Sequence, residues 1–108
     1  MKWYRNLYAG DSVAGKIDRI KWKIKHNAGM ISVYVIAFPS NQSNLLDIIP
    51  TRDLMQKAYP QKNMTIIGLA KGYREALELV RRIVDDTYQN TGTVDVKAYL
   101  EEMEGKSL

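Results

Sequence analysis

The stretch MTIIGLAKGYREALELVRRIVDDTYQ, residues 64–89, decides the fold of this chain. Its beginning, Met64 to Leu69, is an apolar run that predicts a strand. The segment from Gly68 to Gly72, with a glycine at each end, predicts a turn. From Tyr73 to Gln89, apolar residues recur with helical spacing and predict a long amphipathic helix. A strand that leads into a helix N-terminus is where α/β proteins usually present backbone N–H groups to a ligand.

Three further strands are predicted upstream of this stretch. Trp3–Tyr8 is rich in aromatic residues, which favour strands. Met30–Phe38 is a nearly continuous apolar run, typical of a central strand that is covered on both faces. Leu45–Ile49 is a short strand that Pro50 ends, so we expect it near an edge of the sheet.

The segment Val13–His26 fits two patterns. Residues 20–25 alternate between apolar and polar as a half-buried strand does, and with this interpretation residues 17–38 form a long hairpin. A cap at Ser12 and the stop signal at residues 27–29 favour a helix instead, which is our prediction. One helical stripe then contains Val13, Ile17, Ile20 and Ile24.

Two shorter helices complete the set of predicted elements. Thr51 is expected to cap a helix from Arg52 to Ala58, which Tyr59-Pro60 stops. Residues 90–92 end the long helix, and an acidic tail helix is predicted at about residues 95–104. The side chains expected to dock this tail helix are Val96, Tyr99 and Leu100.

A chain of 108 residues predicts one domain, residues 1–108, of class α+β or α/β. The order βαββαβ plus a C-terminal helix predicts a four-stranded mixed sheet, ferredoxin-like or a related sandwich. The ferredoxin-like pattern has its helices on one face of the sheet. Helices on both faces are the alternative, which the apolar runs in the second and fourth strands favour.

Composition excludes several kinds of chemistry. The chain has no cysteine, so disulfides, thiolate metal sites and cysteine catalysis are excluded. His26 is the only histidine, and neither a catalytic triad nor a histidine zinc site can be built on it alone. No pair of carboxylates has a spacing that demands acid–base catalysis. We therefore expect a non-enzymatic protein with no cofactor and no metal.

The ends and the hydropathy pattern predict a cytoplasmic protein. No apolar segment of a secretory signal follows Met1, and the longest apolar run, residues 33–38, is far shorter than the roughly 20 residues that span a bilayer. Positive charge is concentrated in the basic segment 1–26, where seven Lys and Arg face two Asp, whereas residues 27–108 carry a net charge of −1. Such asymmetry is typical either of a solvated helix face or of a surface for an acidic partner.

Two sets of residues are candidate sites. On the predicted first helix, Trp22 lies opposite the apolar stripe, and we expect an exposed partner surface there. Its residues are Arg19, Trp22, Lys25 and His26. The second set would bind an anionic or phosphorylated ligand at the predicted turn, although the glycines there also fit a purely structural role. Its residues are Gly68, Lys71, Gly72 and Arg74.

Four segments carry a resemblance to known proteins: VYVI at 33–36, NLLDIIP at 44–50, IGLAKGY at 67–73 and EALELV at 75–80. Through them most of the chain resembles a family of small bacterial proteins known from genome sequences. The resemblance implies a single cytoplasmic α/β domain. The family has no assigned activity, so no catalytic residue is implied.

Three functions follow as hypotheses. The first is a protein-interaction or regulatory module that binds a protein partner, or a second copy as a homodimer, through a sheet edge or the Trp22 surface. The second is a binder of a small anionic ligand at the Gly68–Gly72 turn. The third is a weak nucleic-acid binder, although no recognition motif accompanies the charge. The cations it would use are Lys16, Arg19, Lys21, Lys23 and Lys25.

Overall fold

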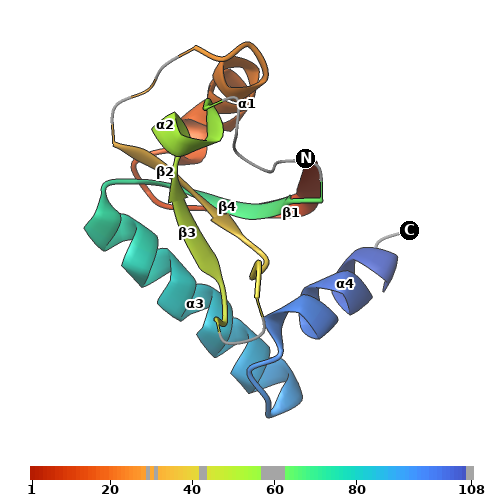
Figure 1. Cartoon of the computed structure of the whole chain (residues 1–108). Helices are drawn as coiled ribbons and strands as arrows, with labels where there is room; N and C mark the ends of the chain where they lie inside the picture. Colours follow the sequence, from red (N-terminus) through yellow and green to blue (C-terminus); the bar gives the residue numbers. More distant parts are fainter. Residues whose placement is uncertain (29, 31, 42–43, 57–62, 107–108) are drawn as a thin grey trace.

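The computed structural model describes residues 1–28, 30, 32–41, 44–56 and 63–106 (Figure 1). The elements, in chain order, are β1 (Lys2–Ala9), the 3-10 turn η1 (Ala14–Lys16), α1 (Ile17–Lys25), β2 (Val33–Ala37), β3 (Asp47–Pro50), α2 (Thr51–Leu54), β4 (Thr65–Lys71), α3 (Tyr73–Thr91) and α4 (Val96–Lys106).

The four strands form one mixed sheet in the order β1-β4-β2-β3. β1 runs parallel to β4, whereas β2 is antiparallel to both of its neighbours. The predicted fold class and the four-stranded mixed sheet are confirmed, and β3 lies at an edge as expected. The order βαββαβ is followed by two helices, α3 and α4, and not by one. α1 and α2 lie on one side of the sheet and α3 and α4 on the other (Figure 1), so the alternative with helices on both faces is correct and the ferredoxin-like pattern holds only approximately.

Each face of the sheet has its own apolar cluster. Ile20 and Ile24 of α1 and Leu54 of α2 belong to the cluster on one face. Val35 and Ile36 are adjacent in β2, both fully buried, and belong to opposite clusters, which confirms that β2 is covered on both faces. The α3 side is filled by Tyr4, Ile67, Ala70, Ala76, Leu79, Ile83, Val96 and Leu100.

The predicted turn at Gly68–Gly72 is wrong. β4 continues to Lys71, which pairs with Val33 of β2. Only Gly72, at φ +83°, lies between this strand and α3. The reason is that β4 pairs with a neighbour on each side, and these two ladders outweigh a local turn signal.

Gly68 instead allows close packing at an irregularity inside β4. Ile36 pairs with Gly68 and the next residue of β2 pairs with Ile66, so Ile67 is an extra residue of the kind that forms a β-bulge. A Cβ atom on Gly68 would lie 3.1 Å from Cδ2 of Leu79 and 3.3 Å from Cβ of Ile36. Glycine therefore lets α3 sit directly on the sheet.

Within the segment Val13–His26, η1 and α1 make residues 14–25 helical, which confirms the predicted helix and excludes the hairpin. The first turn is 3-10, and the predicted cap at Ser12 is wrong: Val13 and Lys16 hold the N-cap positions of η1 and α1, and neither makes a capping side-chain hydrogen bond to a described residue. The Ser12 hydroxyl donates to Glu75 instead. The predicted stop is confirmed: Asn27 is left-handed at φ 53°, and the Ala28 N–H donates to the Lys23 carbonyl at 2.8 Å.

Thr51 does not cap α2. Pro50 holds the N-cap position and Thr51 is the first helical residue. The Thr51 side chain is buried, and its hydroxyl has no partner among the described residues. The predicted helix to Ala58 is too long: α2 ends at Leu54, Met55 is its C-cap, and the Gln56 N–H donates to the Asp53 carbonyl at 3.3 Å in a three-residue turn that closes the helix. The predicted stop at Tyr59-Pro60 falls on residues 57–62, outside the described residues.

Both C-terminal helices confirm their predictions. α3 ends at left-handed Gly92, with φ 74°. α4 begins after Asp95, whose side chain accepts the Ala98 N–H at 3.2 Å. Val96 and Leu100 are buried against the sheet side of α3 as expected. No helix within the described parts of the chain has the length and apolar character needed to cross a membrane.

Candidate functional site

The first turn of α3 is held by a carboxylate of the chain itself. One oxygen of Glu75, the third helical residue, accepts the Lys71 N–H at 2.9 Å. The other accepts the Ser12 hydroxyl at 2.6 Å and the Ser12 N–H at 3.3 Å. A glutamate at this position resembles the acidic half of a capping box, and its charge suits the positive end of the helix dipole. This turn therefore already holds an anionic group.

The four residues of the predicted anion site are placed differently from one another. Lys71 and Arg74 are exposed, but Gly68 is buried inside β4 and does not border the turn. The Gly72 N–H donates to the Ser32 carbonyl at 2.6 Å, and that of Lys71 is used by Glu75. An external phosphate would have to displace Glu75. The sequence could have predicted that Glu75 occupies this position, because a glutamate three residues after the N-cap residue is typical of a capping box.

We expect Glu75→Gln to lower the free energy of unfolding at neutral pH by about 1 kcal/mol. Burial raises the pKa of Glu75, but the hydrogen bonds from Lys71 and Ser12 outweigh this and leave the pKa below its ordinary value of 4.5. A depressed pKa in the folded state means that the charged form stabilises the fold above pH 4.5, and that this contribution disappears as the pH falls through the folded-state pKa.

The measurement is urea unfolding of both proteins between neutral pH and about pH 3. The difference between them should shrink on acidification. Glu102→Gln, which removes one member of an exposed ion pair on α4, is the control and should change little. A gap between wild type and Glu75→Gln that stays constant with pH would contradict the assignment.

The Trp22 surface is exposed, as the sequence predicts. Trp22 is 58% exposed, and Arg19, Lys25 and His26 are exposed on the same helix. The His26 ring stacks on the indole with a centroid distance of 4.2 Å, and its Nδ1 donates to the Trp22 carbonyl at 2.8 Å. One face of the indole is therefore covered within the chain.

The basic residues of the first helix do not all line the same groove; Lys16 and Arg19 line two grooves, one of them together with Lys23. Lys16, Arg19 and Lys21 line a groove beside β1 with a volume of about 930 Å³, which also contains Asp18. Lys21 is directed onto the Trp3 ring, with 5.2 Å from Nζ to the ring centroid. Lys23 and Lys25 do not line this groove.

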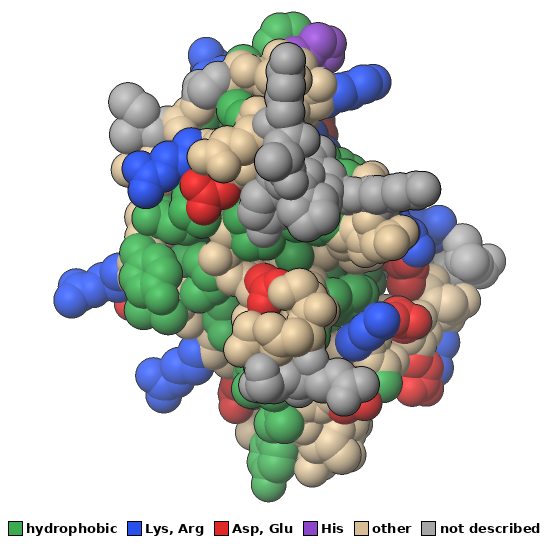
Figure 2. Space-filling model, viewed as in Figure 1, with side chains coloured by type: hydrophobic (Ala, Val, Ile, Leu, Met, Phe, Trp, Pro, Cys, Tyr) green, Lys and Arg blue, Asp and Glu red, His purple; other side chains and the backbone are tan. Residues whose placement is uncertain are grey.

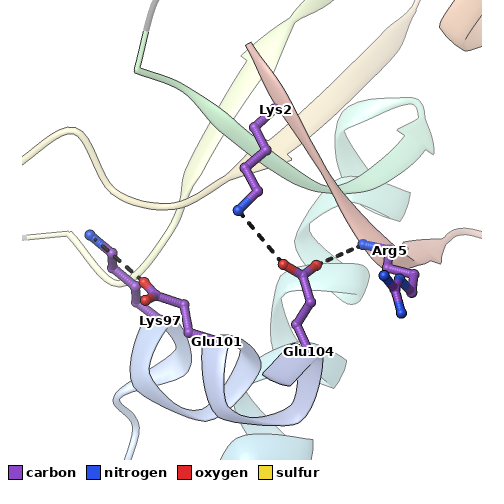
Figure 3. A network of polar contacts seen from close by, with 5 residues as sticks. All are labelled: Lys2, Arg5, Lys97, Glu101 and Glu104. Atoms are coloured by element: carbon purple, nitrogen blue, oxygen red, sulfur yellow. Dashed lines mark hydrogen bonds and ion pairs between the residues drawn. The ribbon is translucent and has the colours of Figure 1, made fainter. Parts of the chain in front are cut away.

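A cleft of about 760 Å³ lies between α4 and the beginning of β1 and β4. Figure 3 shows Glu104 of α4 directed toward β1, where it accepts the Arg5 N–H at 3.0 Å and lies 3.7 Å from Nζ of Lys2. Lys97 and Glu101 form a second ion pair at 4.0 Å (Figure 3). Four charged side chains of the cleft thus form two ion pairs, and Asp47, which also lines it, accepts hydrogen bonds from the Ser40 N–H and the Asn44 side chain.

These contacts fit a structural role better than a catalytic one. Burial raises the pKa of Tyr4, and the charge of Glu104 and then Tyr99 raise it further. Glu104 occupies an N–H on the outer edge of β1, which limits pairing with another strand there. Among the described residues, no three histidine, cysteine, aspartate or glutamate side chains are grouped so that they could hold a metal ion.

The long apolar stripe of α3 is only half covered. Ala76, Leu79 and Ile83 are buried against the sheet. About 100° around the helix lies a second row, in which Tyr73, Leu77 and Tyr88 are exposed and Val80 and Val84 are half-buried. We call the set Tyr73, Leu77, Val80, Val84 and Tyr88 the α3 stripe. Figure 2 shows hydrophobic side chains gathered over α3 and the neighbouring edge of the sheet, with Lys and Arg at their margin.

The two sides of α3 have different neighbours. On the β1 side, the Tyr8 hydroxyl donates to Asp86 at 2.9 Å, and Arg82 donates to the Ala9 carbonyl at 3.3 Å. Burial, then the hydrogen bond and charge of Asp86, raise the pKa of Tyr8. α4 packs on β1 and on α3. On the opposite side, the Tyr73 ring contacts the Tyr34 ring of β2 edge to face, at a centroid distance of 5.8 Å. The α3 stripe lies on that less covered side.

Comparisons of the chain with protein-family models, with curated proteins and with solved structures found no match. The resemblance to a family of small bacterial proteins therefore stays a prediction. The candidate site rests on the geometry of this chain alone.

Proposed function

We propose that this protein is a non-enzymatic protein-interaction module and that the α3 stripe is its contact surface. The observation that carries this proposal is the exposure of three large apolar side chains along one row of a helix: Tyr73 at 55%, Leu77 at 48% and Tyr88 at 55%. From Tyr73 to Tyr88 the row is roughly 22 Å long at 1.5 Å per residue. A contiguous apolar row of this kind marks an interaction site, and tyrosine is enriched among the residues that dominate binding energy.

Other surfaces support the proposal less. The outer edge of β1 is occupied at Arg5 by Glu104, and the opposite edge strand, β3, has only four residues and ends at Pro50. The surface around Trp22 offers one large exposed apolar side chain among the described residues of α1, and His26 stacks on it. The α3 stripe instead offers five aligned side chains on a rigid helix.

The test is photo-cross-linking in cells that produce the protein. A photoreactive amino acid replaces Leu77, and in a matched control it replaces exposed Glu102 on α4. We expect a protein adduct of defined mass from position 77 that is absent from position 102. The adduct should disappear when Tyr73 and Tyr88 are changed to serine. Identical adducts from both positions, or none from position 77, would show that the stripe is not a contact surface.

A further inference from the structure

We propose that the partner of the α3 stripe is a second copy of this chain, with the two α3 helices antiparallel and related by a two-fold axis at Val80. This inference rests on the proposed function for the choice of surface. It goes further because it fixes the partner, the orientation and the register. Most soluble oligomers are symmetric, and a two-fold interface requires a surface that is complementary to itself.

The apolar residues of the stripe are arranged symmetrically about Val80. Leu77 and Val84 lie three and four residues from it, and Tyr73 and Tyr88 lie seven and eight residues from it. In an antiparallel pair centred there, Val80 meets the partner's Val80. Leu77 then meets the partner's Val84, and Tyr73 meets the partner's Tyr88. Each aromatic end of the stripe covers the other aromatic end.

The charged residues beside the stripe are also complementary to themselves in an antiparallel pair. At 100° per residue, Arg74, Glu78, Arg81 and Asp85 form a row along its solvent side. Read in reverse order, the signs of this row are opposite at every position. The antiparallel register therefore places Arg74 against the partner's Asp85 and Arg81 against the partner's Glu78. A parallel pair would place each residue against its own copy and bring like charges together.

The charged residues of α3 fall into two groups, one bonded within the chain and one exposed beside the proposed interface. Glu75, Arg82 and Asp86, on the far side from the stripe, are hydrogen-bonded within the chain. The four residues of the row beside the stripe are exposed, and none forms an ion pair or a side-chain hydrogen bond among the described residues. Exposed ion pairs contribute little energy, so we assign the apolar contacts to affinity and the charged row to orientation and register.

Sedimentation equilibrium of the purified full chain is the first test. We expect a monomer–dimer equilibrium that Leu77→Asp weakens by about tenfold or more. Val94→Asp, at an exposed apolar residue in the loop before α4, is the control and should leave the dimer unchanged. Circular dichroism of each variant verifies that it is folded.

Charge exchange tests orientation. Arg81→Glu and Glu78→Arg should each weaken the dimer, because each places like charges together across the axis. The double variant E78R/R81E should restore the wild-type Kd, since both cross-helix pairs are again opposite. Failure of the double variant to recover would overturn the register.

Introduced thiols locate the axis, because the chain has no cysteine of its own. Val80→Cys should form a disulfide-linked dimer with itself under mild oxidation. Leu77→Cys should do so only when mixed with Val84→Cys. Efficient self-linking of Leu77→Cys would indicate a parallel pair and overturn the arrangement. A monomeric chain whose Val80→Cys variant does not link would overturn the homodimer, while an adduct of Leu77 to another protein would leave the proposed function standing.

Discussion

Replacing Gly68 with valine is expected to lower the free energy of unfolding by about 3 kcal/mol. The added Cβ atom alone would lie 3.1 Å from Leu79 and 3.3 Å from Ile36, both in the core between β4 and α3. The two further methyl groups of valine have no space unless α3 moves away from the sheet. Urea unfolding monitored by tryptophan fluorescence measures the loss.

A series of glycine variants separates crowding from backbone effects. Gly68→Ala should destabilise less than valine, by roughly 1–2 kcal/mol. Gly15→Ala is the control, because a Cβ there would have nothing within 4 Å, and we expect no loss of stability. If Gly68→Val and Gly15→Ala unfold at the same urea concentration, α3 does not press on Gly68 in solution.

Gly68 also shows how far the sequence determines the fold. The strand could be predicted from its apolar run and the long helix from its helical periodicity. A direct connection between them follows from their order in the sequence. The position of the turn could not, because a glycine in a strand and a glycine in a turn have the same local appearance. The pairing of Lys71 with Val33 decides between them, and that contact joins segments far apart in the chain.

The candidate site was predictable to a similar degree. The apolar width of α3 is visible in the sequence, but periodicity cannot tell which half of a wide stripe the sheet will cover. Ile83 is buried and Leu77 is exposed only because α3 lies over the centre of the sheet with α4 on its β1 side. The exposure of Trp22 was easier to predict. The apolar stripe of α1 is narrow, so only one side of that helix can face the core, and Trp22 lies on the other side.

The contacts between α4 and β1 could not be predicted at all. Glu104 accepts the backbone N–H of Arg5, which is 99 residues away in the sequence. Nothing in the acidic composition of the tail distinguishes this glutamate from Glu101 or Glu102. Its importance comes from strand order, because β1 is an edge strand and its outer N–H groups face no other strand of the sheet.

Truncation of Leu100 to alanine is therefore expected to have two linked effects. Leu100 is only 2% exposed and joins α4 to the cluster beneath α3, so the substitution should lower the free energy of unfolding by about 3 kcal/mol. Loosening of α4 also withdraws Glu104 from the Arg5 N–H. Amide hydrogen exchange at Arg5 should accelerate, and the protein should aggregate more readily through the uncovered edge of β1.

Two variants distinguish packing from edge protection. Met103→Ala, at a residue of α4 that is 39% exposed, should cost less than about 1 kcal/mol and leave exchange at Arg5 slow. Glu104→Gln keeps Leu100 packed but weakens the bond to Arg5, so exchange there should accelerate with little loss of global stability. If Leu100→Ala unfolds more easily while the Arg5 amide remains as protected as in the wild type, α4 stabilises the core but does not guard the β1 edge.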